Sequence, residues 1–156
     1  MINNNDIEAI KQLKYRYFRL LDLKRFDELE QLMLPECTSD LRDGRHCHDN
    51  RDSLMAFLRE SMGRHDLLSM HNGHHPEIEM IDDHEARGTW NMHDIVIDRQ
   101  HDIRLEGNGF YEDRYRKVNG EWFIVHTGYK STFELVQPLG KVLELYNGFD
   151  AGTFDA

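Results

Sequence analysis

The hydrophobic pattern of the chain changes its period near Gly63, and this change limits the possible fold more than any other feature of the sequence. Before Gly63, apolar residues recur at three- and four-residue steps, which is the spacing of amphipathic helices. After it, apolar and polar residues alternate, as they do in strands with one buried face. Helices followed by a run of long strands predict an α+β domain, in which the helices pack on a curved, mostly antiparallel sheet.

Three helices are expected in the first part of the chain, and polar residues mark where they start. The first should be capped by Asn5 or Asp6 and the third by Asn50 or Asp52. Pro35 should end the second helix, because proline lacks the amide hydrogen that a helix needs. The predicted ranges are 6–23, 26–33 and 49–62.

Four strands are expected after the helices. The Asn119-Gly120 pair favours a tight hairpin, since both residues tolerate positive φ. A second hairpin is predicted at Asp82-Asp83. The tail from Gln137 onward has a weak pattern, and it could form a lid, a subunit contact or a partly disordered end. The predicted strand ranges are 67–81, 84–98, 103–118 and 121–136.

The length of 156 residues suits one domain, so residues 1–156 are predicted to be a single unit with 137–156 as a C-terminal extension. No apolar run approaches the roughly 18 residues of a membrane span, and no basic-then-apolar leader is found at the start. These features predict a cytoplasmic protein. Cys37 and Cys47 are then expected to be unpaired small thiols. The net charge of -10 argues against a nucleic-acid partner.

Asp94 is the first candidate for chemistry. The alternation of the second predicted strand puts it on one face with Trp90, Met92 and Val96. An acid among large apolar side chains must be hydrogen-bonded, paired or protonated, which favours a functional role. The alternative is that Asp94 lies where the strand leaves the core and is solvated.

Asp22 and Tyr17 lie near the end of the first predicted helix. Their five-residue separation corresponds to about 140° around a helix, so the two side chains do not share a face. They can still converge if Tyr17 points inward and Asp22 reaches over the helix end. The alternatives are a surface acid for Asp22 and a core aromatic residue for Tyr17.

Three histidines stand within five residues: His71, His74 and His75. Their spacing fits no standard zinc pattern, and neither does that of His46 with Cys47, so no metal is expected. A histidine beside a carboxylate is a better chemical unit, because it exchanges protons near neutral pH. The sequence contains no nucleophile elbow, phosphate-binding loop or dinucleotide motif, and hence gives no local support for acyl transfer, nucleotide chemistry or hydride transfer.

Several segments together resemble a known family. In order and spacing, they are similar to the SnoaL-like family of the nuclear transport factor 2-like superfamily, nearest to the bile-acid 7-alpha-dehydratases and more distantly to the scytalone dehydratases. The likeness covers roughly residues 6 to 135, and it implies a cone of helices and bent sheet around a deep apolar pocket, commonly assembled as a homotrimer. The segments are DIEAIKQLKYRYFRLLDLKRFDELEQLM, LLSMHNGHHPEIEM, GTWNMHDIVI and GFYEDRYRKVNGEWFIVHTGY.

The resemblance also implies site residues. The family's histidine and aspartate fall on His71 and Asp22, which would form a dyad, and its tyrosine and second acid fall on Tyr17 and Asp94. His74 is then either a neighbour of the site or a structural histidine, and His75 is a structural histidine. Leu41 stands where the bile-acid enzymes have a pocket tyrosine, a departure that weakens the expectation of a steroid substrate.

The function expected from this likeness is a cofactor-free lyase that removes water from a hydroxylated, apolar carbonyl compound such as a steroid or polyketide. A ring isomerase or polyketide cyclase could use the same pocket. A protein that only binds a small ligand or forms oligomers is the opposing class, and a noncatalytic partner of a ring-hydroxylating oxygenase is a third possibility. Neither a cofactor nor a metal is expected. The expected substrate-binding residues are Leu41, Trp90, Met92, Phe110, Tyr111 and Tyr129.

Overall fold

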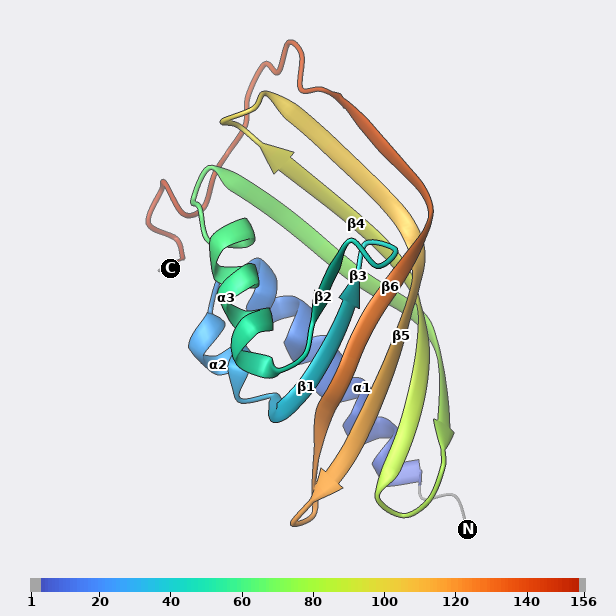
Figure 1. Cartoon of the computed structure of the whole chain (residues 1–156). Helices are drawn as coiled ribbons and strands as arrows, with labels where there is room; N and C mark the ends of the chain where they lie inside the picture. The colour runs from blue at the N-terminus through green and yellow to red at the C-terminus, as the bar shows by residue number, and fades with distance from the viewer. Residues whose placement is uncertain (1–3, 155–156) are drawn as a thin grey trace.

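A computed structural model describes residues 4–154 of the chain, and within this range it contains three helices and six strands (Figure 1). The helices come first, and the four longest strands follow them. None of the helices within residues 4–154 is both long and apolar enough to cross a membrane. The elements are α1 (Asn4–Asp22), α2 (Phe26–Glu30), β1 (Met33–Leu41), β2 (His46–His48), α3 (Arg51–Met62), β3 (Leu67–Met80), β4 (Glu85–Asp98), β5 (Ile103–Val118) and β6 (Glu121–Pro138).

The six strands form one open sheet in the order β2-β1-β6-β5-β4-β3. Neighbouring strands are antiparallel except β1 and β6, which run parallel. Figure 1 shows that the long strands bend midway and that the helices lie together on the concave side. The prediction of a cone-shaped α+β fold is therefore confirmed.

Helix α1 supplies much of the core. Its apolar positions are predicted to face inward; Ile7 is only half-buried, and the structure buries the others: Ile10, Leu13, Tyr17, Leu20 and Leu21. One residue departs from the expected pattern. Lys14, which lies among the polar positions of the helical repeat, has no exposed surface. The sheet must therefore supply a partner for a buried ammonium group.

The predicted start of α1 and end of α2 were wrong. Helix α1 begins at Asn4, so Asn5 and Asp6 lie inside it rather than at its cap. Helix α2 ends at Glu30, and Met33 begins strand β1, which also contains Pro35. Proline fits there because the β1–β6 register shifts between positions 33 and 38, where no ladder hydrogen bond is needed. Strands β1 and β2 were not predicted.

The other turn and cap predictions are confirmed. Asn50 caps α3, since its side-chain oxygen accepts a 2.9 Å hydrogen bond from the backbone N–H of Ser53. The β5–β6 hairpin turns at Asn119 and Gly120, with φ values of 51° and 87°. Asp82 closes the β3–β4 turn by accepting hydrogen bonds from two backbone N–H groups that follow it.

A bulge bends the long β5–β6 pair. The register shifts at Asn108 and Gly109, and a Cβ atom on Gly109 would lie only 2.0 Å from the carbonyl oxygen of Lys130. Only glycine permits the two strands to approach this closely. The bend turns the far half of the sheet over the helices, and this leaves space for a cavity between them.

The tail beyond β6 folds back over the sheet edge. Asn147 is buried and donates a 2.9 Å hydrogen bond to the carbonyl oxygen of His65. The ring of Phe149 stacks on the ring of His65, with the centroids 5.7 Å apart. These contacts attach the tail near the start of β3. Between them and β6 lies an exposed apolar stretch that includes Leu143.

Candidate active site

His71 and Asp22 form a close pair at the end of α1. His71 Nδ1 lies 2.6 Å from Asp22 Oδ1, and the backbone N–H of His71 donates a 2.9 Å hydrogen bond to Asp22 Oδ2. The hydroxyl of Ser69 donates to Oδ1 as well, at 2.8 Å. Three donors from β3 thus fix the Asp22 carboxylate, and the carboxylate fixes the imidazole. With Nδ1 engaged, Nε2 is the ring nitrogen left to exchange a proton with a ligand.

Asp94 is the direct neighbour of His71 on the adjacent strand, because the β3–β4 register pairs these two positions. The side chain is 8% exposed, and its Oδ1 atom is buried without a hydrogen-bond partner among residues 4–154. Burial raises the pKa of Asp94 to about 6, although the charge of His71 and the backbone N–H of Asn72 favour the ionised form. The alternative of a solvated acid at the core's edge does not hold.

The pKa of His71 responds to opposing effects. Burial disfavours the imidazolium, but the hydrogen bond to Asp22 and the negative charges of Asp94 and Asp22 outweigh burial and raise the pKa above its ordinary value of 6.5. The imidazole is therefore a stronger base than a free histidine. This is the arrangement expected of a dyad in which a carboxylate orients the ring and stabilises its charged form.

The His71–Asp22 pair borders a cavity through the His71 side chain. The volume of this cavity, about 360 Å³, is within the range of small-molecule binding sites. All six strands of the sheet contribute to its wall, together with α1 and α3. Burial raises the pKa of the Tyr17 and Tyr111 hydroxyls, which therefore stay protonated. The lining residues are Tyr17, Leu21, Leu41, Arg42, His46, Phe57, Leu58, Ser61, Met62, His71, Asp94, Val96, Leu105, Tyr111, Tyr129 and Glu134.

Three of the expected pocket residues line this cavity: Leu41, Tyr111 and Tyr129. Three others do not, and this corrects the expectation. Phe110 lies on the opposite face of β5 and is 45% exposed, because successive strand residues alternate faces. Trp90 and Met92 point inward but are enclosed in the core, where Trp90 Nε1 donates a 2.9 Å hydrogen bond to the Tyr115 hydroxyl.

The sequence did not identify Arg42, His46, Phe57 or Glu134 as residues of the cavity. Arg42 and His46 flank the β1–β2 turn, and neither strand was predicted. Glu134 lies near the end of β6, where the bulge beside Gly109 changes which residues face inward. A helical signal did mark α3, but the side of that helix facing the cavity depends on the tertiary packing.

Two further histidine–carboxylate pairs occur within residues 4–154, both away from the cavity. His93 Nε2 lies 2.9 Å from Glu106 Oε1 on the outer sheet face, and His101 Nδ1 lies 2.8 Å from Asp98 Oδ2. In each pair the histidine is more exposed than His71, at 36% and 58% against 10%. Of the three, only the His71–Asp22 pair has a residue in the wall of the inner cavity.

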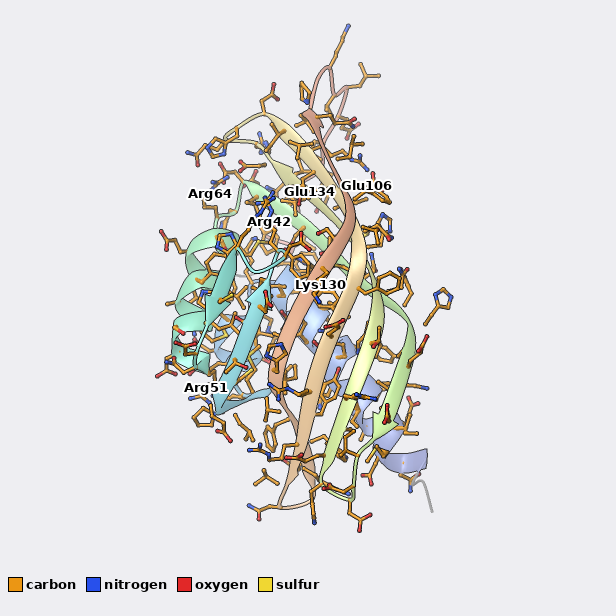
Figure 2. All side chains as sticks on the ribbon, turned by 45° about the vertical axis from the view of Figure 1, so that its right-hand side comes forward. Arg42, Arg51, Arg64, Glu106, Lys130 and Glu134 are labelled. Atoms are coloured by element: carbon orange, nitrogen blue, oxygen red, sulfur yellow. The ribbon has the colours of Figure 1, made fainter. Side chains whose placement is uncertain are left out.

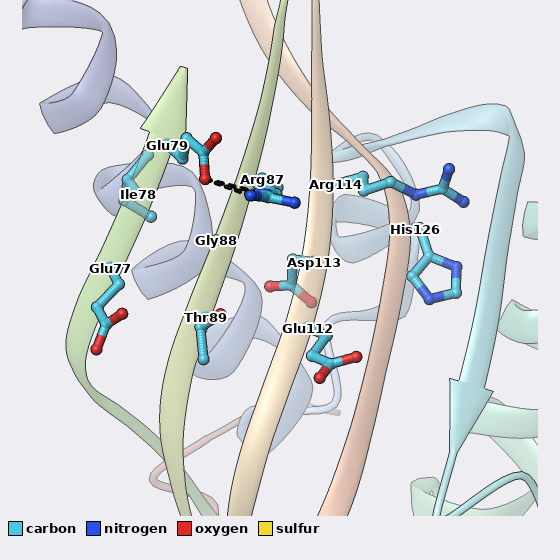
Figure 3. A pocket seen from close by; sticks show the side chains of 10 residues that line it. All are labelled: Glu77, Ile78, Glu79, Arg87, Gly88, Thr89, Glu112, Asp113, Arg114 and His126. Atoms are coloured by element: carbon cyan, nitrogen blue, oxygen red, sulfur yellow. Dashed lines mark hydrogen bonds and ion pairs between the residues drawn. The ribbon is translucent and has the colours of Figure 1, made fainter. Parts of the chain in front are cut away.

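A larger hollow of about 760 Å³ lies on the outer face of the sheet. Figure 3 shows its wall, where charged side chains predominate and Arg87 pairs with Glu79 across adjacent strands. Asp113 is buried, but the other charged side chains of this wall are exposed to solvent, and none of the predicted site residues is among the lining residues. The inner cavity is therefore the better candidate for catalysis.

Within residues 4–154, no group of three or more histidine, cysteine, aspartate or glutamate side chains is arranged to hold a metal ion. His74 and His75 are exposed, and a register shift follows His74. Both cysteines are unpaired; Cys37 is buried, whereas Cys47 is exposed.

Comparisons with known proteins agree with this architecture. A protein of Novosphingobium aromaticivorans, provisionally assigned as a scytalone dehydratase, has a TM-score of 0.79 at 20% identity, over 90% of this chain and 97% of the other. The type-3 hexachlorocyclohexane dehydrochlorinase LinA of Novosphingobium barchaimii has a TM-score of 0.77 at 11% identity, over 91% and 95%. At these identities the likeness establishes the fold alone. The SnoaL-like domain matches residues 4–128, most of the chain, and the chain therefore belongs to the SnoaL-like domain family.

Proposed function

We propose that this chain is a cofactor-free lyase that removes water from a hydroxylated, mostly apolar carbonyl compound such as a polyketide-derived ring or a steroid. The observation that carries the proposal is the His71–Asp22 pair, which adjoins a largely apolar cavity beside the buried, unpartnered oxygen of Asp94. A base, an acid and an apolar chamber are the components that an elimination of water requires.

His71 acts as the base. Its Nε2 atom takes a proton from the carbon next to the substrate carbonyl, and the electrons of that C–H bond form the new C=C bond as the C–O bond breaks. Asp22 holds the ring and stabilises the imidazolium that forms. The departing hydroxide takes a proton from the site, so the products are an unsaturated carbonyl compound and one water molecule.

Tyr17 and Asp94 act on the oxygen atoms. The Tyr17 hydroxyl stays protonated, and it donates a hydrogen bond to the oxygen where charge develops. Asp94, with a pKa of about 6, is protonated in part of the molecules near neutral pH and supplies the proton to the departing hydroxide. Exchange of protons with water then returns His71 to its neutral form and Asp94 to its protonated form.

Two relatives in fold carry names that denote eliminations. One is provisionally a dehydratase, which removes water, and the other is a dehydrochlorinase, which removes hydrogen chloride. Both reactions take a proton from carbon and release a leaving group from a neighbouring carbon. The SnoaL-like fold thus supports the reaction class, whereas the residues of this cavity support water as the leaving group, because an acid stands beside the base.

The first test is mass spectrometry on a panel of β-hydroxy ketones of two to four rings, incubated with the wild type, His71→Ala and His74→Ala. His71→Ala should lower turnover by about 10²- to 10⁴-fold. The control His74→Ala removes an exposed imidazole three residues away and should leave turnover unchanged. Product of unchanged mass would indicate an isomerase instead. Water loss that survives in His71→Ala would refute the proposed base.

We also propose that the chain forms a homo-oligomer, which the resemblance to the dehydratases suggests is a trimer. Apolar side chains are exposed on the outer face of the sheet: Met70, Phe110, Phe133 and Leu135 are each 42–58% exposed. Association would remove this surface from water. Light scattering during gel filtration would give the mass in solution, and Phe110→Glu should convert an oligomer to monomer.

A further inference from the structure

Arg42 occupies an unusual position at the wall of the cavity. It follows the last residue of β1, and both Arg42 and Asp43 have positive φ values of 54° and 58°. Two hydrogen bonds hold this turn against β6: Asp43 donates its N–H to the Tyr129 carbonyl, and its carboxylate accepts from the N–H of Ser131. The backbone at Arg42 is therefore fixed, and its side chain lines the cavity.

The guanidinium of Arg42 is only partly used. Its Nη2 atom pairs with Glu134 of strand β6. Figure 2 labels both side chains, which lie near one another in that view. Its Nε atom is buried and has no hydrogen-bond partner among residues 4–154. A buried donor on a charged group is costly to leave without an acceptor. Because this donor belongs to a residue of the cavity wall, an oxygen of the bound molecule is the natural acceptor.

The charges around Arg42 define what kind of oxygen fits. Glu134 already balances the guanidinium, so a ligand carboxylate would bring a second negative charge to a neutral pair. Asp94 adds a further acid to the same cavity wall. A neutral carbonyl oxygen accepts the Nε hydrogen bond without this repulsion, because it carries a dipole rather than a full charge.

Arg42 and the dyad approach the ligand from different sides. The pair of Arg42 and Glu134 lies at β6, whereas His71 lies on β3, and β5 and β4 separate these strands in the sheet. The step from β6 to β3 crosses three strand spacings of about 4.8 Å each, so roughly 14 Å measured along the sheet separates Glu134 from His71. A molecule that reaches both must carry its two oxygen functions at opposite ends of an apolar body.

We propose that the substrate bears a second, neutral carbonyl oxygen, in addition to the carbonyl beside the departing hydroxyl, at the end remote from that hydroxyl, and that Arg42 determines specificity by donating its Nε hydrogen bond to this second oxygen. This inference rests on the proposed function, because it takes the same cavity as the substrate site. It narrows the substrate class to uncharged, two-ended molecules and excludes those with a terminal carboxylate.

Three fluorescent probes with one ring system test this inference by binding alone. They are 6-propionyl-2-naphthol, which has the carbonyl; 6-propyl-2-naphthol, which lacks it; and 6-hydroxy-2-naphthoate, which replaces it with a carboxylate. The wild type should bind the ketone about tenfold or more tightly than the alkyl probe, which is the usual effect of one hydrogen bond to a charged group. The carboxylate should bind more weakly than the ketone.

Two variants separate the hydrogen bond from the charge. Arg42→Lys keeps the positive charge beside Glu134 but has no Nε donor, so the advantage of the ketone should disappear while the alkyl probe binds as before. Glu134→Gln keeps the shape of the side chain but frees the charge of Arg42, so the carboxylate probe should gain about tenfold in affinity. An undiminished ketone preference in Arg42→Lys, or carboxylate as the tightest ligand of the wild type, would overturn the inference.

A measurement on the wild type makes the result independent of variant folding. The Nε–H resonance of Arg42 in nitrogen-15-labelled protein should move when the ketone is added and stay in place with the alkyl probe. The inference would also be contradicted if none of the three probes bound, or if the ketone and the alkyl probe shifted the Arg42 Nε–H resonance equally. In His71→Ala the ketone preference should persist although turnover is lost. If the protein removed no water from any substrate but still preferred the ketone probe to the alkyl probe, the proposed lyase activity would be rejected and the role of Arg42 would stand.

Discussion

Asp94 and Asp113 lie on adjacent strands, both point inward, and both are almost completely buried, at 8% and 2% exposure. Their surroundings differ. Asp113 lies 2.8 Å from Nζ of the buried Lys14 and accepts a 2.8 Å hydrogen bond from the Tyr115 hydroxyl. Asp94 lines the cavity and forms no ion pair among residues 4–154, although the Oδ1 atom of each acid lacks a hydrogen-bond partner in that range. A buried acid that has its own counterion serves the fold, whereas one that faces an open space beside a histidine is available to a ligand.

The Lys14–Asp113 pair should give the largest effect on stability. Lys14→Met leaves the Asp113 carboxylate buried without its counterion, and we expect unfolding to become easier by about 3–5 kcal/mol. Urea denaturation monitored by tryptophan fluorescence would measure the loss. The double variant Lys14→Met/Asp113→Asn removes both charges, and its new amide can still accept the hydrogen bond from Tyr115. It should therefore recover a large part of the lost unfolding free energy. A loss below about 1 kcal/mol in the single variant would show that the pair is not structural.

Asp94→Asn should have the opposite effect on stability. Because the pKa of Asp94 is about 6 in the folded chain against an ordinary value of 3.8, the folded state binds more protons between these pH values, and stability falls as pH rises through 6. The neutral amide removes this cost, so the variant should be more stable at pH 8 by up to about 3 kcal/mol. The gain should vanish near pH 4. A destabilised variant at pH 8 would show that the carboxylate has a counterion in the fold.

Asp22→Asn changes the base rather than the core. The amide has the size of the carboxylate but lacks its charge, so the pKa of His71 should fall, and the pH at which turnover reaches half its maximum should fall with it. We expect a stability cost of only about 1 kcal/mol, since the amide oxygen of the new side chain still accepts hydrogen bonds. Carbon-13 NMR titration measures the pKa of His71 in the wild type and in the variant. Equal titration in both proteins would remove Asp22 from the proposed dyad.

The sequence predicted most of the fold because its strongest signals are local. The helical repeat of α1 and the alternation of β3 to β6 are each read within one segment, and the Asn119-Gly120 turn fixes its hairpin through backbone preferences alone. Strands β1 and β2 carry no such pattern. Strand β1 forms by pairing in parallel with β6, about 90 positions later, and no short stretch of sequence contains that information.

The same limit explains the site. Asp94 could be placed inward from alternation, but its position beside His71 depends on the β3–β4 register. The pairing of Asp22 with His71 was inferred only from family likeness, since it joins a helix end to a strand 49 positions away. Lys14 was missed because its partner, Asp113, is 99 positions further along the chain. Residues that act together here are distant in sequence, so periodicity alone could not group them.

Asp98 offers the finest test of the comparison, since it shares with Asp94 both the strand and the inward face. Burial opposes its charge, but the hydrogen bonds from His101 and Arg64 outweigh burial and lower its pKa. Its stabilising effect should therefore be present at neutral pH and be lost as pH falls, opposite in sign to that of Asp94.

Asp98→Asn should cost about 1 kcal/mol at pH 7, a small effect because both partners are partly exposed. Urea denaturation of both variants at pH 4 and 8 would check the opposite slopes. Parallel slopes would mean that burial, rather than the presence of a counterion, decides how these acids behave.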